Sequence, residues 1–276
     1  MKEKEFYTIG EVSKICNISK KALRFYDQIG IISPDKVQEE NNYRYYSKKT
    51  LLSIPVVKYY KQMGFKLDEM REVLDGDSYQ TVERQFRKKI DELDEQLSLI
   101  RNSYISVKDW YNLVLEARMV LENGSNEVAI KYVEPEEYVY MAQDFSYNYM
   151  ESIINIDWTN YLEEIGNEIT GAVILSFPSF MEKMEGRASR CRIMQRPILK
   201  YKPEQVVTLG GYMAATCYHI GSLETIGKTY RKIYNWIREH GYELETNCYE
   251  RYVTDYWTLR KPEQFVTEVV VEVRRK

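Results

Sequence analysis

Apolar residues recur along this chain with three successive periodicities, and each predicts a different kind of structure. Up to residue 76 they follow short helical patterns separated by turn residues. From Tyr79 to Leu121 they recur at alternating spacings of four and three residues, and beyond residue 127 they alternate with polar residues as strands do. The pattern therefore predicts a multidomain α+β protein with three parts: 1–76, 77–122 and 127–276.

The first part begins with two predicted helices. Thr8 and Glu11 have the spacing of a capping box, so a short helix should run from Ile9 to about Ile15. Ser19 is a credible N-cap for a second helix that stops before Gly30. Two short helices joined by a tight turn, the second with basic residues at its start, form a helix-turn-helix.

Basic residues give the second helix a polar, positively charged face. Lys20 and Lys21 lie in its first turn, the part of a recognition helix that points toward base edges or phosphates. Arg24 follows one turn later, where a guanidinium can bind a phosphate with two hydrogen bonds. Solvated surface charges are the alternative interpretation.

A predicted hairpin follows at Asn41 to Ser47, "NNYRYYS". Asn-Asn is a turn signal and "YRYY" alternates as a strand does, so we expect a wing with Arg44 at its edge. The alternative is that Arg44 is an ordinary strand charge facing solvent. Two more helices, "SKKTLLSIPVVKYYKQMGF" and "KLDEMREVLDG", complete a winged helix-turn-helix, and the first is expected to carry an apolar stripe of Leu52, Val56, Tyr60 and Met63.

The most regular pattern lies between Tyr79 and Leu121, a helix of roughly 60 Å at 1.5 Å per residue. No Gly or Pro interrupts it, and a 3.5-residue period keeps one seam against a partner. The same helix of a second subunit is the simplest partner, which predicts a coiled-coil homodimer. The seam consists of Phe86, Ile90, Leu93, Leu97, Ile100, Tyr104, Val107, Tyr111, Val114, Arg118 and Leu121.

After a linker at Glu122 to Glu127, "ENGSNE", the order of elements predicts two copies of a strand-helix-strand unit with extra strands. Such an order is typical of an α+β domain whose antiparallel sheet is covered by helices on one side. We expect the other side to be free to form a ligand cleft.

Charge is distributed unevenly. The chain has a net charge of −3, but residues 1–66 hold 13 Lys and Arg against 7 Asp and Glu, a net of +6 that leaves −9 for the remainder. A basic segment on an acidic body is the pattern expected when one end meets a polyanion. The 25 tyrosines suggest a partly wet recognition surface, although Tyr in place of Phe in half-buried strands is the simpler explanation for most of them.

Other chemistry is predicted to be absent. The four cysteines are scattered, without a CxxC and with only two histidines in the chain, so we expect reduced structural thiols and neither a metal site nor a cofactor. No apolar run is long enough to cross a bilayer and no signal peptide is apparent, so a soluble, cytoplasmic protein without membrane contact is expected.

Three motifs in the first part of the chain together resemble those of a known family. "FYTIGEVSKICNISKKALRFYDQIGIISP", "NNYRYYS" and "MGFKLDEMREVL" resemble the DNA-binding half of MerR-family transcription regulators, over about 75 residues. The resemblance implies a homodimer that binds a palindromic operator in double-stranded promoter DNA and distorts it so that RNA polymerase engages both promoter elements. The residues expected at the DNA are Thr8, Lys20, Lys21, Arg24, Tyr26, Arg44, Tyr45 and Lys66.

The C-terminal 150 residues resemble, more loosely, the gyrase-inhibitor-like effector domain of the multidrug-sensing BmrR subgroup. That resemblance implies a lipophilic, cationic small molecule held against a buried glutamate among aromatic rings, and it places the glutamate at Glu250 in "CYERYV". A solvated strand glutamate paired with Lys or Arg is the alternative. Glu268 matches a second acidic position or lies on the outer face. The further candidates for the pocket are Tyr147, Trp158, Phe177 and Tyr252.

A ligand-responsive transcription activator, not an enzyme, is therefore expected. Two alternatives remain open from the residues. The effector domain could be a hydrolase-like enzyme with Glu250 as a general base, although no Ser/His/Asp or Cys/His set surrounds His219 or His240. A DNA-bending architectural protein with a vestigial pocket is the other.

Overall fold

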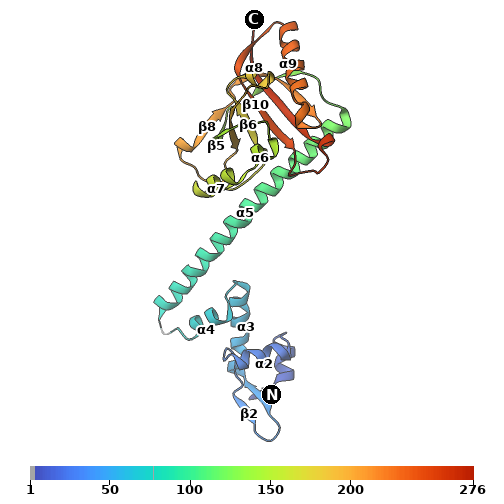
Figure 1. Cartoon of the computed structure of the whole chain (residues 1–276). Helices are drawn as coiled ribbons and strands as arrows, with labels where there is room; N and C mark the ends of the chain where they lie inside the picture. Colours follow the sequence, from blue (N-terminus) through green and yellow to red (C-terminus); the bar gives the residue numbers. More distant parts are fainter. Residues whose placement is uncertain (1–3, 77) are drawn as a thin grey trace. The chain divides into compact units, whose positions relative to one another are not determined.

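The computed structural model describes residues 4–76 and 78–276, which form two compact units that divide between Leu97 and Ser98 (Figure 1). The long helix α5 (Tyr79–Asn123) begins in the first unit and ends in the second. Residue 77, the expected start of the dimerisation segment, and residues 1–3 lie outside the described part. Among the described residues, no helix has both the length and the apolar character needed to cross a membrane.

The first unit combines short helices with a three-stranded antiparallel sheet of strand order β1-β3-β2. Its elements are β1 (Phe6–Thr8), α1 (Ile9–Ile15), α2 (Lys20–Gln28), β2 (Lys36–Gln38), β3 (Tyr43–Ser47), α3 (Lys48–Gln62) and α4 (Leu67–Leu74). The predicted helix-turn-helix and wing are confirmed in α1, α2 and the β2–β3 hairpin. The short strand β1 was not predicted.

Both predicted helix starts are present. The backbone N–H of Glu11 donates to Thr8 Oγ1 (3.4 Å), and the Glu11 carboxylate accepts from the Thr8 backbone N–H (2.9 Å). Ser19 Oγ accepts from the backbone N–H of Ala22 (3.0 Å). These bonds satisfy backbone donors that a helix leaves unpaired in its first turn, which is why the short helices α1 and α2 begin where they do.

The stripe expected on α3 was wrong at three of its four residues: Tyr60 packs against the core of the first unit, but Leu52, Val56 and Met63 are exposed. Leu52 is 67% exposed, whereas Leu51, Ile54 and Val57 are the residues that enter the core of the first unit. Both sets have helical spacing, so periodicity alone does not distinguish them. The exposed residues Leu52, Val56 and Met63 leave an apolar strip on the outside of α3.

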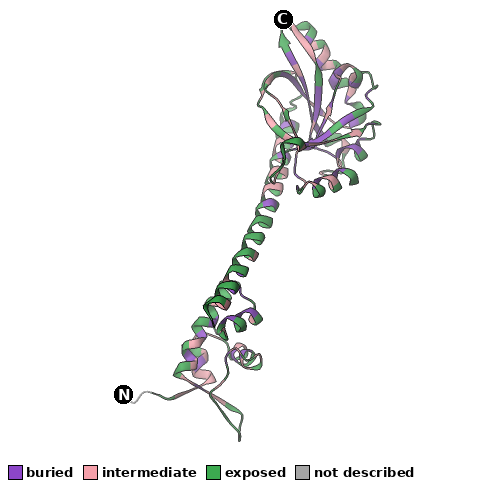
Figure 2. Cartoon of the chain, turned by 90° about the vertical axis from the view of Figure 1, so that its left-hand side faces the viewer, coloured by how far each residue is buried: buried purple, intermediate pink, exposed green. Residues whose placement is uncertain are grey.

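The predicted long helix is confirmed, and most of its seam is exposed in a single chain. The exposed seam residues are Ile90, Leu93, Leu97, Ile100, Tyr104, Val107, Tyr111, Val114 and Leu121, at 36–70% exposure. Figure 2 shows exposed positions predominating along α5 and buried ones concentrated on the strands. At the start of α5, the buried pair Lys89–Glu69 (2.7 Å) attaches it to α4. A second copy of the seam is the covering that its apolar side chains require.

The second unit is built on one eight-stranded antiparallel sheet of order β4-β9-β11-β10-β6-β7-β5-β8. Its strands are β4 (Ala129–Val133), β5 (Glu136–Asp144), β6 (Ile174–Phe177), β7 (Arg190–Gln195), β8 (Val206–Leu209), β9 (Tyr212–Ile220), β10 (Tyr242–Thr254) and β11 (Val266–Arg275). Its helices are α6 (Tyr149–Ile153), α7 (Ile156–Glu164), α8 (Phe180–Met184) and α9 (Gly227–Glu239), with 3₁₀ turns η1 (Pro203–Gln205), η2 (Leu223–Thr225) and η3 (Pro262–Gln264). The α+β class with an antiparallel sheet is confirmed.

The two faces of this sheet are covered differently. On one face Trp158 of α7, Phe180 of α8 and Tyr230 of α9 pack with strand residues in the main core. On the other face Leu113, Ala117 and Val120, in the last part of α5, pack with Val253 and Val266. The sheet is therefore packed between α7, α8 and α9 on one face and the last part of α5 on the other.

Candidate DNA interface and ligand pocket

A groove of about 560 Å³ lies between the start of α2 and the wing. It brings together three of the predicted basic residues, Lys20, Arg24 and Arg44, with Thr8 at its side. Lys20, Lys21 and Arg24 are exposed on α2, and none of the nine lining residues is acidic. A concave, positively charged surface beside a helix N-terminus fits a phosphate-bearing partner.

Arg44 has a second role in this groove. Its Nε donates to Asp27 Oδ2 of α2 at 2.8 Å, and both side chains are partly buried. The ion pair joins the wing to the recognition helix, so the spacing between the two elements depends on it. Arg44 therefore both holds the wing and lines the groove.

The other predicted DNA residues are placed less uniformly. Tyr26 is only 7% exposed and belongs to the core of the first unit, so its side chain is placed to support α2 and not to line the groove. Thr8 uses its hydroxyl to cap α1, and Tyr45 is half-buried with its hydroxyl 3.4 Å from Gln38 Oε1. Lys66 is exposed at the start of α4 and does not line the groove.

The second site centres on Glu250, which lies in the middle of β10 with neighbours β6 and β11. Its side chain is fully buried. Glu250 Oε1 accepts from the Tyr230 hydroxyl (2.9 Å) and lies 2.9 Å from Lys183 Nζ, while Oε2 accepts from the Tyr252 hydroxyl (2.5 Å). A buried carboxylate with this many donors is a built polar site within an apolar core.

Lys183 reaches this carboxylate from α8. Its side chain is 1% exposed, and its ammonium also donates to the Tyr149 hydroxyl at 2.5 Å. Five aromatic rings lie 4.7–5.2 Å from the same nitrogen, within the range of cation–π attraction; they belong to Phe145, Tyr147, Tyr149, Phe177 and Tyr230. We refer to these five rings with Glu250 and Tyr252 as the cage.

Burial is the main cause of the shifted pKa values of the tyrosines in the cage. It raises the pKa of Tyr149, Tyr230 and Tyr252 far above the usual tyrosine value, and the charge of Glu250 acts in the same direction. Burial likewise raises the pKa of the neighbouring Cys248 to about 12. The phenols therefore stay protonated and can only donate to a carboxylate or accept from a cation.

The four aromatic residues predicted for the pocket are divided by the structure. Tyr147 and Phe177 supply rings of the cage, and Tyr252 donates directly to Glu250. Trp158 lies in the core on α7, stacked on Tyr161, and its indole N–H has no hydrogen-bond partner within the described part of the chain. Three of the four therefore belong to the cage, and Trp158 does not.

Glu268 does not reach the cage. It is buried on β11 directly opposite Arg251, which places it on the other face of the sheet from Glu250. Its carboxylate is paired with Lys131 Nζ (2.5 Å) and Arg251 Nε (2.9 Å). The face of the sheet expected to be free is packed against the last part of α5. The cage lies on the opposite face, where Glu250 points toward α8 and α9.

Three cage residues, Phe145, Tyr149 and Tyr230, escaped the sequence analysis, and so did Lys183 at the centre of the cage. Tyr230 lies in a helix that was predicted, and its aromatic spacing was an available signal. Lys183 lies in α8, a five-residue helix that was not predicted. A lysine in a short polar stretch carries no sequence signal of burial.

A polar network lies directly behind the cage. Arg251 donates to Glu116 of α5 (Nη1 to Oε2, 3.1 Å) as well as to Glu268, and the Tyr218 hydroxyl also donates to Glu116 (2.8 Å). Burial opposes ionisation of Glu116, but the hydrogen bond and charge of Arg251 outweigh it and lower the Glu116 pKa. The network connects β10 to the last part of α5.

Comparison with known proteins identifies two family matches in this chain. Residues 7–77 match the model of the MerR HTH family regulatory proteins, and residues 126–274 match that of the GyrI-like small molecule binding domain. The multidrug-efflux transporter 2 regulator of Bacillus subtilis (strain 168) is 24% identical over 276 residues, 98% of this chain and 97% of that relative.

Two further relatives match over shorter segments. The multidrug-efflux transporter 1 regulator of Bacillus subtilis (strain 168) is 39% identical over 110 residues, 37% of this chain and 39% of that relative. The HTH-type transcriptional regulator CueR of Escherichia coli O6:H1 is 30% identical over 107 residues, 36% of this chain and 78% of that relative.

Proposed function

Because this chain belongs to the MerR family of transcription regulators and ends in a GyrI-like small-molecule-binding domain, we propose that it activates transcription in response to a lipophilic cation bound in the cage. One observation carries the ligand class: the fully buried Glu250 carboxylate is surrounded by aromatic rings. Removal from water strengthens the attraction between a carboxylate and a cation, and the faces of the rings add to it.

The DNA partner is double-stranded promoter DNA. The basic groove of the first unit supplies phosphate contacts, and the exposed seam of α5 supplies the homodimer that a palindromic operator requires. Distorting a duplex costs on the order of a few kcal/mol. A ligand that binds the distorting conformation more tightly can supply that difference and let RNA polymerase engage the promoter.

The cage is proposed as a binding site and not as an enzyme active site. The oxygens of Glu250 are engaged by Tyr230, Tyr252 and Lys183, so no free general base faces a substrate. His219 is held between the Thr229 hydroxyl and the Ser222 carbonyl, both at 2.9 Å. The relatives are also named as regulators. Since promoter DNA and RNA polymerase share the cytoplasm in bacteria such as those relatives come from, we place the working protein there.

Glu250→Gln tests this proposal, because it keeps the side-chain shape and removes the charge. Tetraphenylphosphonium, a lipophilic cation, is titrated calorimetrically into both proteins, and run-off transcription from the operator is measured with and without it. We expect the variant to bind operator DNA normally and to bind the cation about ten- to a hundredfold more weakly, because a charge-assisted interaction has been removed. Cation binding and activation equal to those of the unmodified protein would contradict the proposal.

A further inference from the structure

The cage already contains a cation that is part of the chain. Lys183 Nζ has one carboxylate, one phenol and five rings around it, which is the set of contacts proposed above for a ligand. Its side chain is 1% exposed, so water does not share these contacts. The ammonium therefore lies where an external cation would lie.

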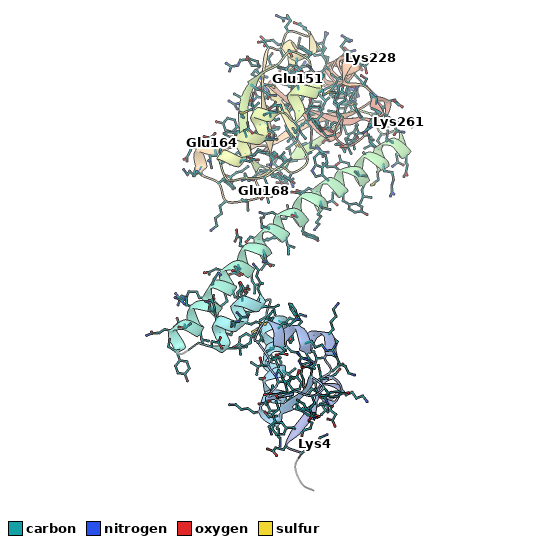
Figure 3. The ribbon with its side chains drawn as sticks, turned by 60° about the horizontal axis from the view of Figure 1, so that its bottom comes forward. Lys4, Glu151, Glu164, Glu168, Lys228 and Lys261 are labelled. Carbon is teal, nitrogen blue, oxygen red and sulfur yellow. The ribbon has the colours of Figure 1, made fainter. Side chains whose placement is uncertain are left out.

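This burial is unusual for a lysine of the second unit. Its other charged side chains include many at the surface, among them Glu151, Glu164, Glu168, Lys228 and Lys261 in Figure 3. Burying an ammonium carries a large desolvation cost, and a buried ion pair is often no more stabilising than an apolar replacement. The Lys183–Glu250 pair is therefore poorly explained as a device for stability alone.

The buried lysine of the first unit offers a comparison. Lys89 pairs with Glu69 and Glu92, and the ring of Phe65 lies 5.4 Å from its ammonium. Lys183 has a single carboxylate and five rings at shorter distances. Lys89 has the surroundings of a structural ion pair, whereas Lys183 has those of a bound organic cation.

We propose that Lys183 is a tethered occupant of the cation site, so that an external cation reaches Glu250 only by displacing it. Lys183 then sets the affinity and selectivity of the pocket. This inference rests on the proposed function, since it deepens the description of the same site. The exchange conserves charge: one cation enters the cage as another leaves for water, and Glu250 is never left unpaired.

The element that carries Lys183 is suited to such an exchange. Helix α8 has five residues, Phe180–Met184, between an N-cap at Ser179 and Gly186, whose φ of 74° reverses the chain. Phe180 and Lys183 are its buried side chains. Met181 and Met184 are half-buried against the same core. A short helix anchored by side chains and not by strand pairing can move without disturbing the ladder of the sheet.

Hydration decides which cations can compete. A primary ammonium is compact and strongly hydrated, so Lys183 regains much solvation when it leaves the cage. A bulky cation with a dispersed charge loses less hydration on entry, and it buries apolar surface as well. The exchange therefore favours lipophilic cations over small ammonium ions. A tethered competitor also acts at an effective concentration of about millimolar or more, so removing it should raise external affinity at least tenfold.

The first test replaces the tether with a free ligand. Lys183→Ala removes three carbons and the ammonium, which together correspond to n-propylammonium. We expect this ion to raise the melting temperature of full-length Lys183→Ala in a saturable way, and 1-propanol to have no such effect. Lys183→Met refills the volume without the charge, and Lys183→Ala/Glu250→Gln lacks the counter-charge, so neither should respond to n-propylammonium.

The second test measures competition. Tetraphenylphosphonium should bind Lys183→Ala at least tenfold more tightly than it binds the unmodified protein. Lys228→Ala, which removes an exposed lysine of the same unit, should leave the affinity unchanged. If Lys183→Ala is unfolded by itself, folding that requires n-propylammonium and not 1-propanol gives the same support.

Several results would overturn the inference: no response of Lys183→Ala to n-propylammonium, failure to fold with either additive, or unchanged or weaker binding of tetraphenylphosphonium. Failure of the proposed function looks different. If both tests succeed but no cation alters transcription, the inference stands and the proposed function fails. If cations activate transcription through Glu250 but Lys183→Ala shows neither effect, the proposed function stands and Lys183 is structural.

Discussion

Glu250 and Arg251 are consecutive residues of β10, and their side chains serve opposite faces of the sheet. Glu250 accepts hydrogen bonds inside the cage, whereas Arg251 pairs with Glu116 of α5 and with Glu268. The alternation of a strand makes this unavoidable, because successive side chains point to opposite sides. A shift of β10 would therefore act on the cage and on the Arg251–Glu116 contact together.

This relationship predicts a variant that separates binding from response. Arg251→Met keeps much of the side-chain volume and removes the hydrogen bonds to Glu116, while Glu268 retains Lys131 and Glu116 retains Tyr218. We expect the affinity for tetraphenylphosphonium to change by less than about threefold and ligand-dependent activation to fall by about tenfold or more, on the scale of coupling energies of about 1–3 kcal/mol. Calorimetry and run-off transcription measure the two quantities on the same preparation.

A control variant addresses general damage. Arg274→Met removes another arginine of the same sheet, which pairs with Glu243 at the surface of β10 and β11. It should leave both quantities unchanged. Full activation by Arg251→Met would show that the response does not pass through this arginine.

The seam of α5 predicts the oligomeric state. Leu93→Asp/Leu97→Asp should produce monomers that no longer bind the operator, because two carboxylates would face their counterparts across a coiled coil. Both leucines are exposed in the single chain, at 44% and 64%, so each protomer should remain folded. Sedimentation velocity at micromolar concentration checks the mass. The control is Leu99→Asp, which changes a leucine outside the seam that is 56% exposed; this variant should remain dimeric. A monomeric unmodified protein would contradict the dimer prediction.

The basic groove predicts a dependence on salt. Arg24→Ala should reduce the slope of log affinity against log salt by about 0.9 for each phosphate that the variant no longer binds, with little change in base preference. Arg44→Ala should weaken binding further, because it also releases Asp27 and loosens the wing. Fluorescence anisotropy between about 50 and about 200 mM salt gives both slopes. Arg87→Ala, an exposed arginine of α5, is the control, and identical slopes for all variants would refute the assignment.

Local rules predicted the first unit well because its signals are local. Thr8 and Ser19 cap helices through bonds to residues three positions away, and that spacing is visible in the sequence. The α3 stripe was misjudged at Leu52, since both faces of that helix carry apolar residues at helical spacing. Choosing between two stripes requires the tertiary core, which no local rule contains.

The residues of the cage were harder to predict from the sequence than the elements of the first unit. Tyr252 was among the expected pocket residues, and the alternation of β10 places it on the same face as Glu250 in the cage. Strand pairing decides that Glu268 faces away, because it lies opposite Arg251 and not opposite Glu250. Lys183 arrives from a five-residue helix whose position depends on the whole domain. A buried charge is the exception to composition rules, so the sequence offered no reason to place Lys183 inside.

His219 predicts how the second unit responds to mild acid. Burial lowers the His219 pKa below its usual value of 6.5, although the hydrogen bond to the Ser222 carbonyl and the charge of Glu250 oppose this shift. Below pH 6.5 the unfolded chain therefore binds a proton before the folded chain does. The contribution of His219 to stability is fully present above pH 6.5 and is lost as the pH falls toward its folded pKa, with a slope of at most about 1.4 kcal/mol per pH unit.

Urea unfolding at about pH 7 and at successively lower pH measures this contribution. All four tryptophans lie in the second unit, so their fluorescence reports its unfolding and not that of the DNA-binding unit. His219→Gln retains polar atoms near Thr229 and Ser222 and cannot titrate, so its unfolding free energy should fall less steeply below pH 6.5 than that of the unmodified protein. His240→Gln, an exposed histidine at the end of α9, should keep the original slope. Parallel curves for all three proteins would mean that His219 protonates without cost in the folded state.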